Sequence, residues 1–148
     1  VAEYKALIKA LELAKKYNGE IVNADSRTLY RGFDIGTAKP EGKHKKIDGH
    51  DAFIIKNIPH YLMDCVGADE EFSLGLYKQK ADEVIKFIHS RGKTPILVGG
   101  TMQYVSAVVE NWQIPAIAPR NSVSVPVIVA NVSSRSVWLM IWKSSSPA

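Results

Sequence analysis

The sequence has almost no cysteine, the residue that cross-links secreted domains, and no apolar run long enough to cross a membrane. Cys65 is its single cysteine, so no disulfide can form within the chain. No apolar run approaches the roughly 20 residues that span a bilayer, and the N-terminus lacks the charged-then-apolar order of a signal peptide. We therefore expect a cytoplasmic protein without a membrane partner, in which Cys65 is a small buried apolar residue.

Candidate metal ligands are also scarce. The spacing of His44, His50, His60 and His89 does not match that of zinc ligands, so we assign no residue as a metal ligand. The formal charge of +4 is compatible with an anionic partner such as RNA, but many proteins with this charge bind no nucleic acid. With 148 residues, 46% of them hydrophobic, the chain can bury a core of its own, and we expect one globular domain and a monomer.

The first third of the chain predicts a helix, a strand and then a long loop. Residues 4–14 have apolar side chains at helical spacing, and Asn18 is placed to end that helix. Residues 20–24 (EIVNA) predict a short strand. The stretch 31–50 is rich in glycine, lysine and aspartate with little periodicity, and Pro40 interrupts it, so we predict mostly loop there.

The middle of the chain predicts a second strand between two helices. Ser73 is placed to cap a helix that ends at Arg91. The face of that helix predicted to meet solvent carries Lys78, Lys80, Asp82, Glu83 and Lys86. Residues 94–98 (TPILV) resemble a strand buried on both faces, and residues 102–110 predict another amphipathic helix. This alternation predicts an α/β layered fold in which helices flank a parallel sheet.

The composition changes near residue 120. Residues 121–148 contain no aspartate or glutamate and many serines and valines. We therefore divide the chain into a core, 1–119, and a divergent Ser/Val-rich tail, 120–148.

Asp25 is the best-placed candidate for chemistry. It follows the strand 20–24, and α/β folds bind their ligands in the crevice above the carboxyl ends of parallel strands. An alternative is that Asp25 and Ser26 only cap the next turn, and that Thr101 only caps the helix after it. Position alone leaves both alternatives open.

Two long motifs identify a family resemblance. Residues 23–40 have the form NADSR-x-LYRG-x-DIGTAKP, and residues 95–101 are PILVGGT. Shorter blocks follow in the same order: Ile58-Pro59-His60, Asp64, Phe72-Ser73 and Arg91-Gly92-Lys93. Together they resemble the tRNA dimethylallyltransferases from about Leu11 to Pro119. At Thr28 this family commonly has glutamine.

The resemblance implies a P-loop-NTPase-like core, a nucleotide- and ATP-binding architecture. It implies transfer of a dimethylallyl group from dimethylallyl diphosphate to the exocyclic N6 of the adenine 3′ of the anticodon in tRNA. Asp25 would be the general base, and Thr101 would lie near the reacting groups. The backbone of Gly99 and Gly100 would approach the diphosphate. Contacts to the tRNA anticodon stem-loop would come from Ser26, Arg27, Tyr30, Thr37 and Lys39.

The resemblance also implies missing parts. Members of the family have a strand and a loop of the form GxTxSGK[ST] before the helix that here covers residues 4–14, and residues 1–7 (VAEYKAL) do not match that loop. We therefore expect a core that is incomplete at both ends, with doubtful Mg²⁺ binding and little activity by itself. The alternatives are a catalytically dead tRNA-binding remnant and a nucleotide kinase-like domain. The valines of 123–132 could pair with an exposed sheet edge or aggregate.

Overall fold

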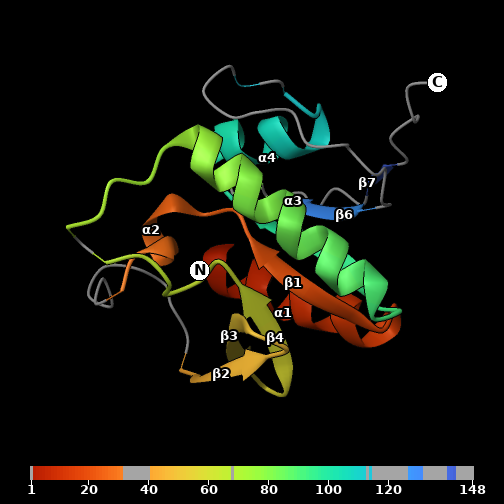
Figure 1. Ribbon diagram of the computed structural model, residues 1–148. Helices are drawn as coiled ribbons and strands as arrows, with labels where there is room; N and C mark the ends of the chain where they lie inside the picture. Colours follow the sequence, from red (N-terminus) through yellow and green to blue (C-terminus); the bar gives the residue numbers. More distant parts are fainter. Residues whose placement is uncertain are drawn as a thin grey trace.

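The chain folds into three layers: a sheet, one long helix on one face and two helices on the other (Figure 1). The computed structural model describes residues 2–31, 41–67, 69–112, 114, 127–131 and 140–142. In chain order its elements are α1 (Ala2–Lys16), β1 (Gly19–Asn23), α2 (Ser26–Leu29), β2 (Lys43–Ile47), β3 (His50–Ile55), β4 (Ile58–Tyr61), α3 (Leu74–Ser90), β5 (Thr94–Gly99), α4 (Met102–Val109), β6 (Val127–Asn131) and β7 (Met140–Trp142).

The seven described strands form one sheet in the order β2-β3-β4-β1-β5-β6-β7. Strands β4, β1, β5 and β6 are parallel to one another, whereas β2, β3 and β7 are antiparallel to their neighbours. The predicted α/β fold with flanking helices is confirmed. The sheet is mixed rather than wholly parallel, because two tight turns join β2, β3 and β4 and short turns can connect only antiparallel neighbours.

The predicted loop over residues 31–50 is wrong from Lys43 onward, where β2 begins a hairpin with β3. Asp48 and Gly49 form its two-residue turn, with φ values of 47° and 83°. An Asp-Gly pair in this conformation is a strong hairpin signal that the sequence contained and we missed. Strand β2 gave no alternating apolar pattern because it is an edge strand, exposed along most of its length.

The predicted elements bury the faces that their apolar spacing indicated. On the α1 face of the sheet, Ala10, Leu11 and Ala14 pack against Ile21 and Ile96. The opposite face is covered by α3 and α4, whose apolar residues form the larger core with β1, β4 and β5. Helical spacing in 4–14, 74–90 and 102–110 and the apolar run 94–98 therefore predicted these elements correctly.

Helix α3 confirms one prediction and corrects another. The Ser73 hydroxyl accepts a hydrogen bond from the Leu76 N–H at 3.1 Å, which is the predicted N-cap. Lys78, however, does not face solvent and is only 7% exposed. Its ammonium forms an ion pair with Asp82 and donates to Asn111 Oδ1 at 3.0 Å, so it joins α3 to the end of α4.

The valine-rich segment does pair with a sheet edge. Strand β6 is parallel to β5, in a register that runs from Ile96 opposite Ile128 to Gly99 opposite Asn131. Crossovers between parallel strands are almost always right-handed. Helix α3 connects β4 to β5 and helix α4 precedes β6, so on their face of the sheet the chain moves along the strand order from β4 toward β6. Helix α1 lies on the other face, where a right-handed crossover moves along the strand order in the opposite direction. Any strand leading into α1 would therefore belong beyond β5, where β6 lies.

Candidate active site at the carboxyl ends of β1 and β5

Two turns meet where β1 and β5 end. The strands are parallel neighbours with Asn23 opposite Val98, so the residues that follow them emerge at the same edge. The Ala24 N–H donates to Val98 O at 2.7 Å, and the Thr101 N–H donates to Ala24 O at 3.1 Å. Backbone hydrogen bonds thus hold the turn that carries Asp25 beside the turn that carries Thr101.

Gly99 lets these two turns approach each other. A Cβ at this position would lie 2.2 Å from the carbonyl carbon of Ala24 and 2.3 Å from its oxygen, which no side chain can tolerate. The close approach of the Ala24 backbone is therefore enough to require glycine at position 99. The predicted contact of Gly99 and Gly100 with a diphosphate stays a prediction.

Asn23 organises the turn from below. It is 4% exposed, and its Nδ2 donates to Asp25 O at 3.1 Å and to Leu62 O at 2.9 Å. Its Oδ1 accepts from the Asp25 N–H and from the Thr28 hydroxyl, both at 3.2 Å. The amide therefore fixes the backbone on both sides of Asp25. We did not single out Asn23 from the sequence, although a polar residue at the last position of a buried strand was the available signal.

The Asp25 side chain caps α2. Its Oδ1 accepts a hydrogen bond from the Arg27 N–H at 2.9 Å and lies 3.6 Å from Arg27 Nε. Asp25 therefore does cap α2, but the cap uses only one oxygen and does not exclude a further role. Oδ2 has no hydrogen-bond partner within the described parts of the chain, and the side chain is 17% exposed. The carboxylate is oriented and keeps an acceptor available.

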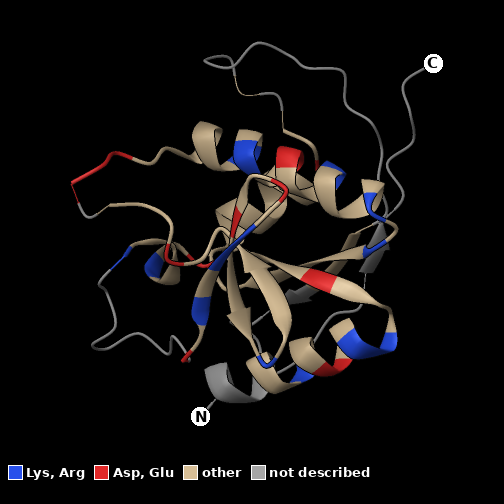
Figure 2. Cartoon of the chain, turned by 60° about the horizontal axis from the view of Figure 1, so that its bottom comes forward, with Lys and Arg blue, Asp and Glu red and all other residues tan. Residues whose placement is uncertain are grey.

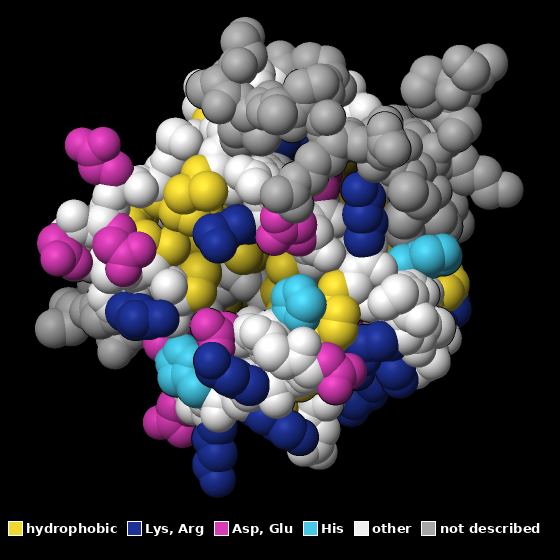
Figure 3. All heavy atoms as spheres, in the orientation of Figure 1, with side chains coloured by type: hydrophobic (Ala, Val, Ile, Leu, Met, Phe, Trp, Pro, Cys, Tyr) yellow, Lys and Arg dark blue, Asp and Glu magenta, His cyan; other side chains and the backbone are white. Residues whose placement is uncertain are grey.

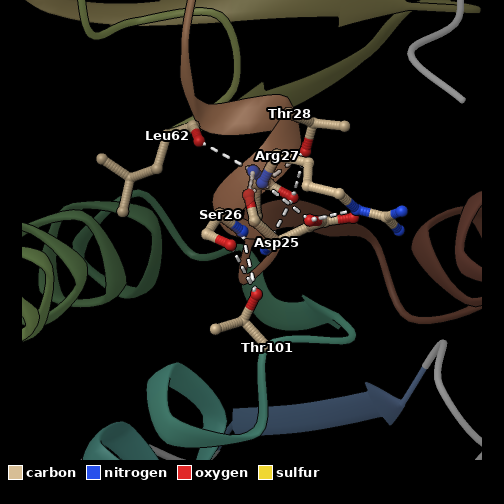
Figure 4. A network of polar contacts seen from close by, with 7 residues as sticks. Asp25, Ser26, Arg27, Thr28, Leu62 and Thr101 are labelled. Atoms are coloured by element: carbon tan, nitrogen blue, oxygen red, sulfur yellow. Dashed lines mark hydrogen bonds and ion pairs between the residues drawn. The ribbon is translucent and has the colours of Figure 1, made fainter. Parts of the chain in front are cut away.

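Thr101 is turned toward Ser26 and not toward its own helix. It occupies the N-cap position of α4 without a side-chain capping bond, so the capping alternative is wrong for this residue. Its Oγ1 accepts from the Ser26 N–H at 2.9 Å and lies 3.2 Å from Ser26 Oγ. Figure 4 shows Ser26 between the two predicted catalytic residues: the Asp25 carboxylate faces Arg27, and the Thr101 hydroxyl faces Ser26.

The structure describes three of the five predicted tRNA contacts. Ser26 lies in the site, Arg27 is exposed beside Asp25, and Tyr30 is half-buried and bridges to Val66. Thr37 and Lys39 lie outside the described residues. All five contacts stay predictions.

A buried tyrosine pair supports the site from the α3 side. The rings of Tyr77 and Tyr104 stack with centroids 3.9 Å apart, and the Tyr77 hydroxyl donates to Asn23 O at 2.7 Å. Burial raises the pKa of Tyr77 well above its ordinary value, so this hydroxyl stays a donor. Both helices thereby hold the end of β1 in place.

His60 and Cys65 do not titrate at neutral pH. His60 is 1% exposed; its Nδ1 lies 2.9 Å from Ile58 O, a contact that places the proton on Nδ1. Its buried Nε2 has no hydrogen-bond partner in the described structure, and burial lowers its pKa to about 4. Burial also raises the pKa of Cys65 to about 11, which disfavours a thiolate.

We expect His60 to make the protein acid-sensitive. In the unfolded chain its pKa returns to about 6.5, so between pH 6.5 and 4 the unfolded state binds more protons. The free energy of unfolding contributed by the neutral ring is complete above pH 6.5 and falls by about 3 kcal/mol on acidification to pH 4. Urea unfolding at several pH values measures it. His60→Phe should flatten this slope and exposed His89→Gln should not; an unchanged slope in His60→Phe would refute the assignment.

The described residues contain no group of three or more His, Cys, Asp or Glu side chains that could hold a metal ion. Among the helices that the structure describes, none is long and apolar enough to cross a membrane.

Fold and site together define an α/β protein of P-loop-NTPase-like architecture, with its polar cluster at the carboxyl edge of the parallel strands. The model of the IPP transferase family matches residues 28–135, which includes β6. The chain belongs to the IPP transferase family, and the resemblance carried by its motifs is confirmed.

Named relatives agree with this assignment. The chain is 49% identical over 111 residues to the tRNA dimethylallyltransferase of Roseiflexus castenholzii, which is 75% of this chain and 33% of the relative. It is 46% identical over 110 residues to that of Herpetosiphon aurantiacus, 74% of this chain and 32% of the relative. The chain thus spans about a third of the length of the curated relatives it matches.

Solved structures show the same fold. The tRNA isopentenylpyrophosphate transferase of Bacillus halodurans matches with a TM-score of 0.62 and 37% identity, over 77% of this chain and 34% of its own. The corresponding protein of Staphylococcus epidermidis matches with a TM-score of 0.59 and 38% identity, over 74% of this chain and 33% of its own.

Proposed function

We propose that this chain activates the acceptor in a transferase that moves a dimethylallyl group from dimethylallyl diphosphate to N6 of the adenine 3′ of the tRNA anticodon. The observation that carries the proposal is the Asp25 carboxylate. It is held at the carboxyl end of β1 by Asn23 and by the α2 backbone, and one of its oxygens is not used by the cap.

The chemistry needs such a carboxylate. The lone pair of an exocyclic adenine amine is delocalised into the ring, so the amine is a poor nucleophile, and a positioned base assists its attack. N6 forms a bond to the allylic carbon, the bond from that carbon to the diphosphate oxygen breaks, and diphosphate leaves with the electron pair. The proton from N6 passes to Asp25.

Ser26 and Thr101 would complete the acceptor side. Because Thr101 accepts from the Ser26 N–H, the hydroxyl pair is fixed next to the carboxylate and offers hydrogen bonds to the incoming groups. Backbone amides of Gly99 and Gly100 would face the diphosphate. The proposal takes no step through Mg²⁺.

A segment exchange tests the proposal. The segment of the Roseiflexus castenholzii relative aligned with this chain is replaced by the corresponding residues of this chain, and transfer of radiolabel from dimethylallyl diphosphate to unmodified tRNA is measured. We expect label at the adenine 3′ of the anticodon, and none when that base is guanine. A folded exchange protein that binds tRNA and transfers nothing would contradict the proposal.

A further inference from the structure

Two adjoining hollows are lined in part by residues of the hairpin formed by β2 and β3. One, of about 480 Å³, lies at the amino ends of the parallel strands and is lined in part by Lys15, Arg91 and Lys93. The other, of about 1120 Å³, is lined in part by Lys43 and Lys56. Lys45, Ile54 and Asn57 line both hollows, so the two are neighbours, and we treat them together as one groove.

Positive charge predominates along this groove. We define the basic groove by its cations, Lys15, Lys43, Lys45, Lys56, Arg91 and Lys93. Its acids are fewer, and two are already paired: Glu20 with Arg91 and Asp64 with His44. Lys43, Lys45 and Lys56 form no ion pair within the described parts of the chain. Figure 3 shows the lysines gathered over the hairpin at the bottom of the view, and Figure 2 shows the blue segments of β2 and of the end of α1.

One end of the basic groove is linked by hydrogen bonds to the helix that Asp25 caps. His44 on β2 lies 2.5 Å from the Asp64 carboxylate, measured from Nε2 to Oδ2. The Asp64 N–H donates to Thr28 O at 2.9 Å, and Thr28 is in α2, the helix that Asp25 caps. The groove therefore begins at a residue that is hydrogen-bonded to α2 and extends from there toward the amino ends of the parallel strands.

Protection of the sheet edge explains only part of this charge. Lysines on an edge strand such as β2 discourage pairing with another chain. That reason does not apply to Lys15 at the end of α1, to Lys56 in the turn before β4, or to Lys93 after α3. These cations come from separate segments and meet along one groove, as expected for a surface that binds an extended polyanion.

We propose that the basic groove binds the phosphate backbone of the RNA whose adenine is presented to Asp25. This inference rests on the proposed function and adds the surface that holds the rest of the substrate. RNA is favoured over a small anion because the cations are distributed along an open groove instead of converging on one point. Neutralising phosphates releases counterions, so binding through the groove is strongly salt-dependent.

Charge removal on β2 tests the proposal in this chain. The probe is a fluorescent, unmodified tRNA anticodon stem-loop, and its affinity is measured by anisotropy over a series of salt concentrations. In Lys43→Gln/Lys45→Gln we expect about tenfold weaker binding at low salt and a slope of log K against log[salt] that is smaller by about 2. Lys43→Arg/Lys45→Arg should bind like the unchanged chain.

The matched control is Lys9→Gln/Lys16→Gln on α1, which changes the net charge equally and lies outside the groove. Lys56→Gln tests the part of the groove that lies away from the edge strand. For this variant we expect the slope of log K against log[salt] to be smaller in magnitude by about 1. The proposal is overturned if the chain does not bind the stem-loop, if the control pair weakens binding as much as the β2 pair, or if neither β2 nor Lys56 variants change the slope. If the lysine variants weaken binding of a polyglutamate peptide as much as they weaken binding of the stem-loop, the groove binds an acidic protein, and RNA is overturned as its occupant.

The two proposals fail separately. If Asp25→Asn leaves transfer intact while the β2 lysines still determine RNA affinity, the proposed function fails and the groove stands. If the lysines do not matter while Asp25→Asn abolishes transfer without changing RNA affinity, the groove fails and the proposed function stands.

Discussion

Replacing Asp25 by asparagine is expected to lower the rate of dimethylallyl transfer by about 10²- to 10⁴-fold, the usual contribution of a positioned general base. Asparagine keeps an oxygen where Oδ1 accepts from the Arg27 N–H, and it is as good an N-cap as aspartate. The free energy of unfolding should therefore change by less than about 0.5 kcal/mol. Single-turnover transfer in the exchange protein measures the rate, and urea unfolding measures the stability.

This substitution separates the two roles that the site gives to Asp25. A residue that only caps α2 would lose little as asparagine, whereas a base loses its proton acceptor. Asp25→Ala removes both functions and should cost about 1 kcal/mol of stability in addition to the rate. Asp48→Asn, in the exposed turn between β2 and β3, is the matched control and should transfer normally. Normal transfer by Asp25→Asn would show that Asp25 is only a cap.

Replacing Arg91 by methionine is expected to destabilise the protein by roughly 3 kcal/mol, since it leaves a buried carboxylate without its cation. The Glu20 side chain is 5% exposed and forms an ion pair with the Arg91 guanidinium. The Tyr61 hydroxyl donates to the same Glu20 oxygen at 3.1 Å. Burial, together with the charge of Glu20, raises the pKa of Tyr61 well above its ordinary value, so Tyr61 stays a neutral donor and supplies no positive charge to Glu20.

A second substitution shows whether the buried charge is the cause. Glu20→Gln in the Arg91→Met background removes the unpaired charge and should restore most of the lost stability. Lys9→Met breaks an ion pair with Glu12 whose side chains are 51% and 62% exposed, and should cost less than about 0.5 kcal/mol. Urea unfolding measures all four proteins. If Arg91→Met costs no more than Lys9→Met, Glu20 does not depend on this partner.

Much of the candidate site could be predicted from the sequence, but not the contacts that hold it. The position of Asp25 after a short buried strand predicted the edge at which it lies, and the motif around it predicted the family. Asn23 was missed because its role depends on Leu62 O, which is supplied by a segment 39 residues away. The contact between Ser26 and Thr101 joins residues 75 apart in the chain, and no local pattern encodes it.

The sequence by itself determined the helices and strands that bury one clear face, the caps at Ser73 and Asp25, and the family. Tertiary structure alone decided that Lys43–Ile47 is an edge strand, that Lys78 is buried between α3 and α4, and that cations from four separate segments line one groove. The physical reason is that apolar periodicity records which face of a segment is removed from water, whereas the identity of its neighbours follows from how all the segments pack together.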